Sequence, residues 1–141
     1  LEALAGTGTG VRLVKGAYAE PAALAFPARR DVDLAFLALA ARLLELSRGA
    51  GGLRPAFATH DVALLERIAA LADTTGVPRA AYEFGMLYGI RVADQRRLAR
   101  AGYGVRDLIA YGTAWYPWYL RRLAERPANV LFVLRQLLPG R

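Results

Sequence analysis

VRLVKGAY, at residues 11–18, is the stretch that decides how the rest of the chain is interpreted. It opens with β-branched and apolar residues and closes with polar ones, which is typical of a strand that ends at a polar edge. Apolar residues then recur at 32, 36, 39, 43 and 46, which is the spacing of one helix face and predicts a helix over 31–48. The two segments together predict one strand–helix unit.

The same unit recurs three more times, and residues 1–10 are predicted to be a flexible lead-in to the first. The further predicted strands are 53–59, 80–84 and 104–110, and the further predicted helices are 62–72, 93–101, 113–125 and 128–138. Asp61 and Thr113 are candidate N-caps, because short polar side chains bond the free N–H groups of a first helical turn. No long linker separates these elements, so the sequence predicts one domain.

Strand–helix units in succession imply a parallel sheet with right-handed crossovers, and hence an α/β fold. Two architectures fit: a small doubly wound sheet, or part of a (β/α)8 barrel. A complete barrel takes about 250 residues, so four units would be half of one. In both architectures the carboxyl ends of the strands meet at one edge, where polar residues of this chain also gather. They are Lys15, Tyr18, Thr59, His60, Glu83 and Tyr111.

The composition excludes several kinds of site. The chain has 141 residues, of which 55% are hydrophobic and 22% are charged, enough for the core of one domain. It has no cysteine, which excludes disulfides and thiolate ligands, and its one histidine, His60, is too few for an ordinary zinc site. No metal is therefore expected. No apolar run reaches the roughly 20 residues of a membrane-spanning helix.

The net charge of +7 raises the question of a nucleic acid or an anionic membrane surface as partner. The alternative to an enzyme is accordingly a basic, non-enzymatic α/β module that binds such a partner. All but one of the 19 basic residues are arginine, spread along the whole chain, which makes the charge weak evidence for a binding face. The exception, Lys15, indicates a place where arginine will not serve.

Arg121 and Arg122 are adjacent on a predicted helix, and Glu125 follows Arg121 by four residues. Both guanidinium groups can converge on one anion, and a carboxylate at this spacing can hold the first of them in place. Such a fork suits a substrate carboxylate. An ordinary exposed helix face with one ion pair is the alternative interpretation.

Arg12 and Lys15 lie three residues apart in one predicted strand, so they face opposite sides unless the strand bends at Gly16. Two cations beside a glycine suit an electron-rich ring or a phosphate, whereas a solvated strand end is the alternative. His60 follows the next predicted strand. It can stack on a flat cofactor or donate a hydrogen bond to it, or it can cap the helix that follows.

Four motifs then occur together in one order. They are RLVKGAY (12–18), FATHD (57–61), YEFGMLYGIR (82–91) and YGTAWYPWYLRRLAERPANVLFVLRQL (111–137). Together they resemble the proline dehydrogenase family, the flavin-dependent enzymes that open proline catabolism. The resemblance implies a distorted (β/α)8 barrel with FAD at the carboxyl ends of its strands. It also implies that residues 11–141 are strands five to eight of that barrel, a fragment of a longer chain.

The resemblance implies a role for each matching residue. Arg12 matches a catalytic arginine near the flavin N5 atom, and the cofactor-binding set is Arg12, Lys15, Gly16, Ala17, Thr59 and His60. The substrate-binding set is Tyr18, Leu87, Arg121, Arg122 and Glu125. The implied reaction is oxidation of L-proline to Δ1-pyrroline-5-carboxylate by hydride transfer to FAD N5, with a quinone as the electron acceptor.

Two departures leave the exact substrate open. Leu108 and Trp118 stand where the family often has tyrosines, so proline, hydroxyproline and related cyclic amino acids remain alternatives. A half barrel has two open edges and an uncovered face, which predicts self-association or completion by the missing half. The resemblance implies a cytoplasmic enzyme, with peripheral association at the inner face of the cell membrane as a further option and no nucleic acid partner.

Overall fold

The computed structural model describes residues 1–16, 20–49 and 51–117. Four short strands alternate with three helices along this part of the chain. The strands are β1 (Gly10–Val14), β2 (Arg54–Ala58), β3 (Glu83–Leu87) and β4 (Gly104–Leu108). The helices are α1 (Arg29–Leu46), α2 (Val62–Thr75) and α3 (Val92–Arg100), with short 3-10 turns η1 (Glu2–Leu4) and η2 (Arg79–Ala81).

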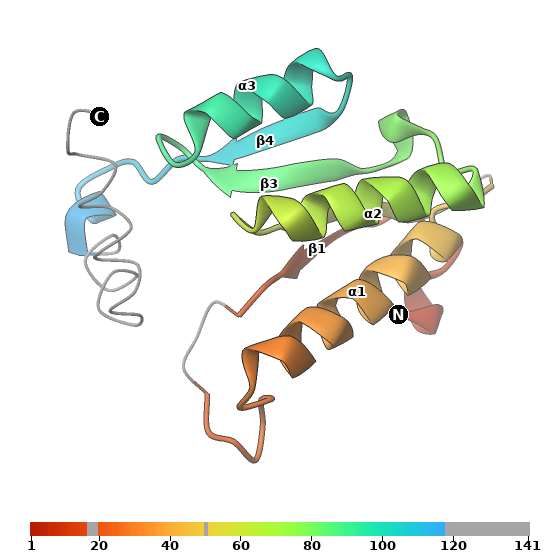
Figure 1. Ribbon diagram of the computed structural model, residues 1–141, viewed down its shortest axis with the longest axis horizontal. Helices are drawn as coiled ribbons and strands as arrows, with labels where there is room; N and C mark the ends of the chain where they lie inside the picture. Colours follow the sequence, from red (N-terminus) through yellow and green to blue (C-terminus); the bar gives the residue numbers. More distant parts are fainter. Residues whose placement is uncertain (17–19, 50, 118–141) are drawn as a thin grey trace.

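The four strands form one parallel sheet in the order β1-β2-β3-β4. The three helices lie on one side of this sheet, in front of the strands in Figure 1. A doubly wound sheet reverses its strand order and carries helices on both faces, which is not what this part of the chain does. The predicted α/β class with parallel strand–helix repeats is therefore confirmed, and the one-sided cover is consistent with part of a (β/α)8 barrel.

The core lies between the sheet and the helices. Phe57 and Phe84 are directly paired in register on β2 and β3, and both are fully buried. Tyr82 packs edge-on against both rings, with centroid separations of 6.0 and 5.6 Å. Helix residues that share this cluster are Phe36, Ala40, Leu43, Leu44, Leu64, Leu65, Ile68, Ala69, Ala72 and Leu98.

The opposite side of the sheet has no helix among the described residues, and we call it the open face. Because side chains alternate along a strand, the residues paired with Arg12 across the sheet share this face with it. They are Ala56, Glu83 and Gly104. The next row toward the carboxyl ends holds Val14, Ala58, Gly85 and Arg106, and beyond it lie Leu87 and Leu108.

At the second unit the predicted start of the helix is confirmed, whereas α2 ends at Thr75, three residues beyond the predicted end. Asp61 precedes the first residue of α2 as expected, although its side chain makes no capping hydrogen bond. Gly76 ends the helix in the left-handed conformation, with φ of 70°, and the N–H of Val77 donates to the carbonyl of Ala72. Glycine adopts this conformation without steric cost, which explains why the helix stops here.

Two strand boundaries differ from the prediction. The first strand ends at Val14 instead of residue 18, because Gly16 takes a positive φ of 48° that a strand cannot contain. The third strand was expected over 80–84 and instead spans Glu83–Leu87, since residues 79–81 form the turn η2 after Pro78. Residues 115–117 are helical, whereas the rest of the helix expected over 113–125 and all of that over 128–138 lie outside the described residues.

The lead-in, residues 1–10, lies against the connection between α1 and β2. Gly8 donates its N–H to the carbonyl of Gly51 at 2.8 Å, and Arg42 of α1 bonds both carboxylate oxygens of Glu2 at 2.7 Å. A Cβ at Gly51 would come within 2.8 Å of the Gly6 carbonyl oxygen, so glycine is required for this approach. The carbonyl of Thr9 also accepts the N–H of Arg54 at 3.1 Å, so the lead-in contacts the domain at several points.

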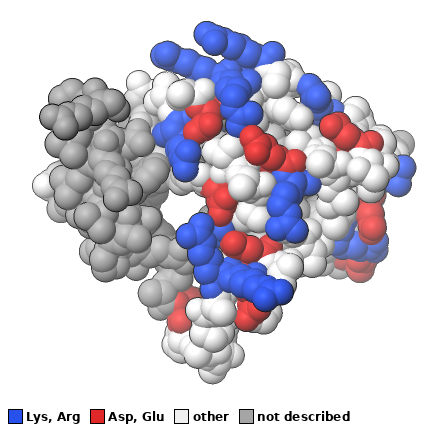
Figure 2. Space-filling model, viewed as in Figure 1, with Lys and Arg blue, Asp and Glu red and all other residues white. Residues whose placement is uncertain are grey.

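Basic and acidic side chains are interspersed over the helical side of the protein, and blue predominates only along α3 at the top of Figure 2. Several of these charges are paired, as in the 2.8 Å bridge from Arg97 to Glu66. None of the helices in the described part of the chain is both long and apolar enough to cross a bilayer.

Candidate functional site

The candidate site lies on the open face, at the carboxyl ends of the strands. Its floor is flat because small residues meet there: Ala58 is paired with Gly85, where a Cβ would lie only 3.3 Å from the Ala58 Cβ. Exposed apolar side chains border this floor at Val14 and Leu108. The edge can therefore receive a flat ligand close to the backbone of the sheet.

Arg12 supplies a cation on this face. It is exposed and makes no ion pair or hydrogen bond with any other described residue. Arg106, on the opposite edge strand β4, is engaged instead, because it bonds both carboxylate oxygens of Glu83 at 2.6 and 2.8 Å. These bonds with Glu83 raise the pKa of the Arg106 guanidinium. Of the two arginines, Arg12 is the one whose charge is available to a ligand.

Lys15 points to the other side of the sheet, toward the start of α1. Its ammonium lies 2.8 Å from Asp61 and 2.6 Å from Asp33, and its side chain is only 10% exposed. The contact with Asp61 is a hydrogen bond, whereas Asp33 Oδ1 makes an ion pair without hydrogen-bond geometry. Arg29 adds a 3.1 Å bond to Asp61. A compact ammonium between two carboxylates explains why lysine, and not arginine, stands here.

Asp61 has two opposing influences on its ionisation. Burial raises the pKa of its carboxyl, but the hydrogen bond and charge of Lys15 together with the hydrogen bond from Arg29 outweigh burial, so that the pKa is lowered overall. The carboxylate therefore stays ionised at neutral pH. This charge cluster links the end of β1 to the segment that follows β2 and to the first turns of α1.

His60 joins the ends of two strands. Its Nε2 atom accepts a hydrogen bond of 3.0 Å from the backbone N–H of Leu87. An accepting Nε2 requires the proton of the neutral ring to be on Nδ1. Burial, and secondarily the charge of Arg91, lower the pKa of His60, so the ring is neutral near pH 7. Since Nδ1 has no partner among the described residues, it is a free donor at the edge of the site.

His60 should make the stability of the fold depend on pH. Its pKa is lowered in the folded protein from an ordinary value of 6.5, so the unfolded chain binds the proton first as the pH falls. The free energy of unfolding is expected to be highest above this value and to decrease from about pH 7 toward pH 5. Urea unfolding followed by circular dichroism across this range measures the effect.

His60→Gln is the matched control for this measurement, because its amide oxygen can accept the Leu87 N–H but does not titrate. The chain has no second histidine, so the variant should show nearly constant stability over the same range. A wild-type chain with constant stability, or a variant with an undiminished pH dependence, would contradict the assignment.

Two further cofactor candidates have local structural roles. Thr59 is buried, and its hydroxyl accepts the N–H of Asp61 at 3.1 Å, which shapes the turn between β2 and α2. Gly16 provides the left-handed turn after β1. The remaining predicted residues lie outside the described part of the chain. They are Ala17, Tyr18, Trp118, Arg121, Arg122 and Glu125.

Sequence reasoning missed two polar residues beside the site. Gln95 of α3 is buried and bonds the carbonyls of Leu87 and Ile90, at 3.1 and 2.9 Å. Asp33 of α1 faces Lys15. Neither stands in a recognisable motif, and only a polar residue shortly after the start of each helix could have drawn attention to them.

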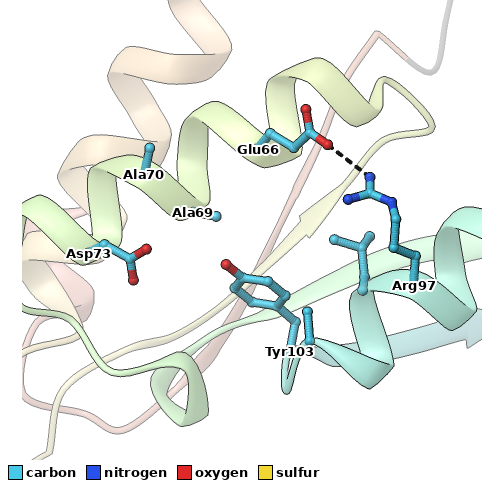
Figure 3. A pocket seen from close by; sticks show the side chains of 8 residues that line it. Glu66, Ala69, Ala70, Asp73, Arg97 and Tyr103 are labelled. Carbon is cyan, nitrogen blue, oxygen red and sulfur yellow. Dashed lines mark hydrogen bonds and ion pairs between the residues drawn. The ribbon is translucent and has the colours of Figure 1, made fainter.

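A groove of about 330 Å³ lies elsewhere, on the helical side between α2 and α3. Figure 3 shows Tyr103 pointing into it and the ion pair between Glu66 and Arg97 spanning one end. None of the predicted site residues lines this groove. We therefore place the site on the open face and not in this groove.

A parallel α/β sheet with a neutral histidine and apolar side chains at its carboxyl edge, and with a cation on the same face, is compatible with α/β enzymes that bind their ligands at this edge. The sequence model of the family described as "Proline dehydrogenase" matches residues 3–135 of the chain. The chain belongs to the proline dehydrogenase family.

Two relatives illustrate this membership. The chain is 46% identical over 128 residues to Proline dehydrogenase 1 of Bacillus subtilis (strain 168), which covers 91% of the chain and 41% of that protein. It is 40% identical over 130 residues to Proline dehydrogenase of Deinococcus radiodurans, which covers 92% of the chain and 40% of that protein. The chain thus spans about two fifths of the length of these curated relatives.

The described residues fit the flavin that the family resemblance implies. The floor formed by Ala58 and Gly85 allows a flat ring to lie close, and Arg12 offers an uncompensated positive charge. His60 adds a hydrogen-bond donor at Nδ1, as its accepting Nε2 requires. The described part of the chain contains no group of three metal-ligating side chains.

Proposed function

We propose that the chain is the C-terminal half of the catalytic barrel of a flavin-dependent proline dehydrogenase. When bound, FAD supplies at its N5 atom the acceptor for the hydride that converts L-proline to Δ1-pyrroline-5-carboxylate, the first step of proline catabolism. The observation that carries the proposal is the family match over residues 3–135, together with an open face on which the side chain of Arg12 has no partner among the described residues.

Arg12 is the proposed catalytic residue of this half. Its guanidinium is unpaired among the described residues and faces the open side of the sheet. A fixed cation at this position stabilises negative charge that develops on an adjacent ring during the reaction. Gly16, Ala17, Thr59 and His60 complete the proposed cofactor contacts. Lys15 is proposed to contribute through its backbone, because its ammonium faces Asp33 and Asp61 on the helical side of the sheet.

Leu87 is the proposed apolar contact for the substrate ring, with Leu108 paired beside it in register. Tyr18, Arg121, Arg122 and Glu125 are the other proposed substrate residues. The two arginines would bind the substrate carboxylate, with Glu125 holding the first of them, and would thereby fix the reacting carbon at near-attack distance. Proline and related cyclic amino acids are the proposed substrates.

The rest of the enzyme must come from outside these residues. The chain spans about two fifths of its relatives, and a sheet with edges at β1 and β4 and an uncovered face invites a further partner. Four more strand–helix units would close the barrel, and self-association is the other way to cover these surfaces. A quinone acceptor, a cytoplasmic location and peripheral contact with the inner membrane face complete the proposal.

A titration with FAD and L-proline tests the proposed function. The chain by itself is expected to bind FAD weakly and to leave its visible absorption band unchanged when proline is added, because half of the contacts are missing. The complete enzyme, with four further strand–helix units, is expected to lose this band on the addition of L-proline. D-proline serves as the matched control for the substrate.

Each outcome decides one part of the proposal. If the complete enzyme keeps its flavin band in the presence of L-proline, the assigned activity is wrong. If the chain alone loses the band as fast as the complete enzyme does, the assignment as half of a site is wrong, while the activity stands.

A further inference from the structure

Gln95 is a buried polar side chain on the inward side of α3. Gln95 is only 8% exposed. Burying an amide group costs free energy unless the group is hydrogen-bonded. Its Nε2 atom donates to the carbonyl of Leu87 at 3.1 Å and to that of Ile90 at 2.9 Å. Both amide protons are therefore used at the carboxyl end of β3.

His60 holds the peptide group on the other side of Leu87 in the chain, through the Leu87 N–H. Because β2 is paired with β3 only as far as Ala58 and Gly85, no strand carbonyl of β2 is paired with Leu87. His60 Nε2 accepts the Leu87 N–H at 3.0 Å and takes the place of that carbonyl. Both backbone polar groups of Leu87 are thus bonded to side chains, one from α3 and one from the end of β2.

These bonds fix the position from which the Leu87 side chain projects. Leu87 is paired with Leu108, whose carbonyl accepts the N–H of Tyr88 at 3.1 Å. The two leucines therefore form one apolar surface at the carboxyl edge of the open face. If the end of β3 moved outward, the Leu87 half of this surface would move with it.

We propose that Gln95 is a positioning residue of this site: with His60 it clamps the two peptide groups that flank Leu87 and so sets how closely the Leu87 side chain packs against a bound substrate ring. The clamp itself follows from the hydrogen bonds, whereas its effect on substrate rests on the proposed function. Gln95 acts through Leu87 and touches no substrate, so its contribution should disappear when the Leu87 side chain is removed.

The first test measures the clamp without activity, by amide hydrogen exchange on the chain. Gln95→Met keeps the length and burial of the side chain but removes both donors. The Leu87 and Ile90 amides should exchange about tenfold faster than in the wild type, relative to the core amide of Phe84. Arg96→Met, on the exposed side of the same helix, is the matched control and should leave this ratio unchanged.

The second test is a double-mutant cycle in the complete enzyme. Gln95→Met should raise KM for L-proline by about fivefold with little change in kcat, which is the signature of lost ground-state binding. In the Leu87→Ala background the same substitution should change KM by less than about twofold, because the residue through which it acts is absent. Affinity for FAD should be the same in all four proteins.

The outcomes separate the two proposals. A fivefold effect of Gln95→Met that persists in the Leu87→Ala background, or equal acceleration of the Leu87 and Phe84 amides, shows a merely structural role and overturns the positioning role. Absence of proline oxidation in the complete wild-type enzyme overturns the proposed function instead, and the substrate part of this inference with it. The exchange ratio then still decides whether the clamp exists.

Discussion

Lys15→Met is expected to lower the free energy of unfolding of the chain by about 2 kcal/mol at neutral pH. The substitution removes the ammonium that lies 2.6 and 2.8 Å from Asp33 and Asp61 and leaves the two carboxylates near each other. Breaking a fully buried pair costs about 3–5 kcal/mol, and we expect less here because the carboxylate side chains are 25% and 21% exposed. Urea unfolding at neutral pH measures the difference.

Two further variants make this expectation specific. Arg12→Met removes an exposed cation from the same strand and should change the stability by less than about 0.5 kcal/mol. Adding Asp33→Asn and Asp61→Asn to Lys15→Met should recover part of the loss, because no uncompensated charge then remains. If Lys15→Met unfolds at the same urea concentration as the wild type, the cluster does not stabilise the strand end.

Acidification should weaken the same cluster in the wild type. The pKa of Asp61 is lowered in the folded protein from its ordinary value of 3.8. The stabilisation that ionised Asp61 gives the fold is therefore complete above pH 3.8 and is lost as the pH falls through the pKa of the folded protein. In Lys15→Met the main cause of that lowering is absent, and the acid-dependent loss should be smaller. The effect of Asp61 can be separated from that of His60, because His60 changes the stability at higher pH, between about 7 and 5.

Arg121→Met in the complete enzyme is the second large expected effect, with KM for L-proline raised at least about tenfold, or roughly 1.4 kcal/mol. The reason is the loss of one arm of the proposed guanidinium fork on the substrate carboxylate. Steady-state kinetics measure it. Arg126→Met, in the same segment of sequence, is the matched control and should leave KM unchanged.

A substrate analogue sharpens this test. Pyrrolidine has the ring of proline without the carboxylate, so its oxidation or binding should respond equally to Arg121→Met and to Arg126→Met. An unchanged KM for L-proline in Arg121→Met, or an equal loss with both ligands, would refute the carboxylate assignment. Because these arginines lie outside the described residues, the expectation rests on the sequence and its family alone.

The repeating part of the fold could be predicted from local patterns. A strand run followed by a helical apolar face marks each unit, and Asp61 and Gly76 mark the two ends of α2 as the structure has them. The boundaries of β3 could not be predicted in this way. Its expected start at residue 80 overlaps η2, because a proline-initiated turn is as compatible with a short apolar run as a strand is.

The candidate site shows the same division. The sequence singled out Lys15 as a place unsuited to arginine. It did not predict which residues pair with Lys15, because Asp33 and Asp61 come from two other elements. For His60 the sequence left three roles open: stacking on a cofactor, donating a hydrogen bond to it, or capping the helix that follows. The structure identifies Nε2 as the acceptor of the Leu87 N–H, a contact over 27 residues of chain.

The sequence by itself determined the α/β class, the strand–helix order and the motifs that mark the family, because each depends on residues close together in the chain. Only the tertiary structure decided that all three described helices lie on one side of the sheet, that Lys15 is held by two carboxylates, and that Leu87 is clamped by His60 and Gln95. The physical reason is that hydrogen bonds and ion pairs between elements depend on the register and packing of the sheet, which local periodicity does not encode.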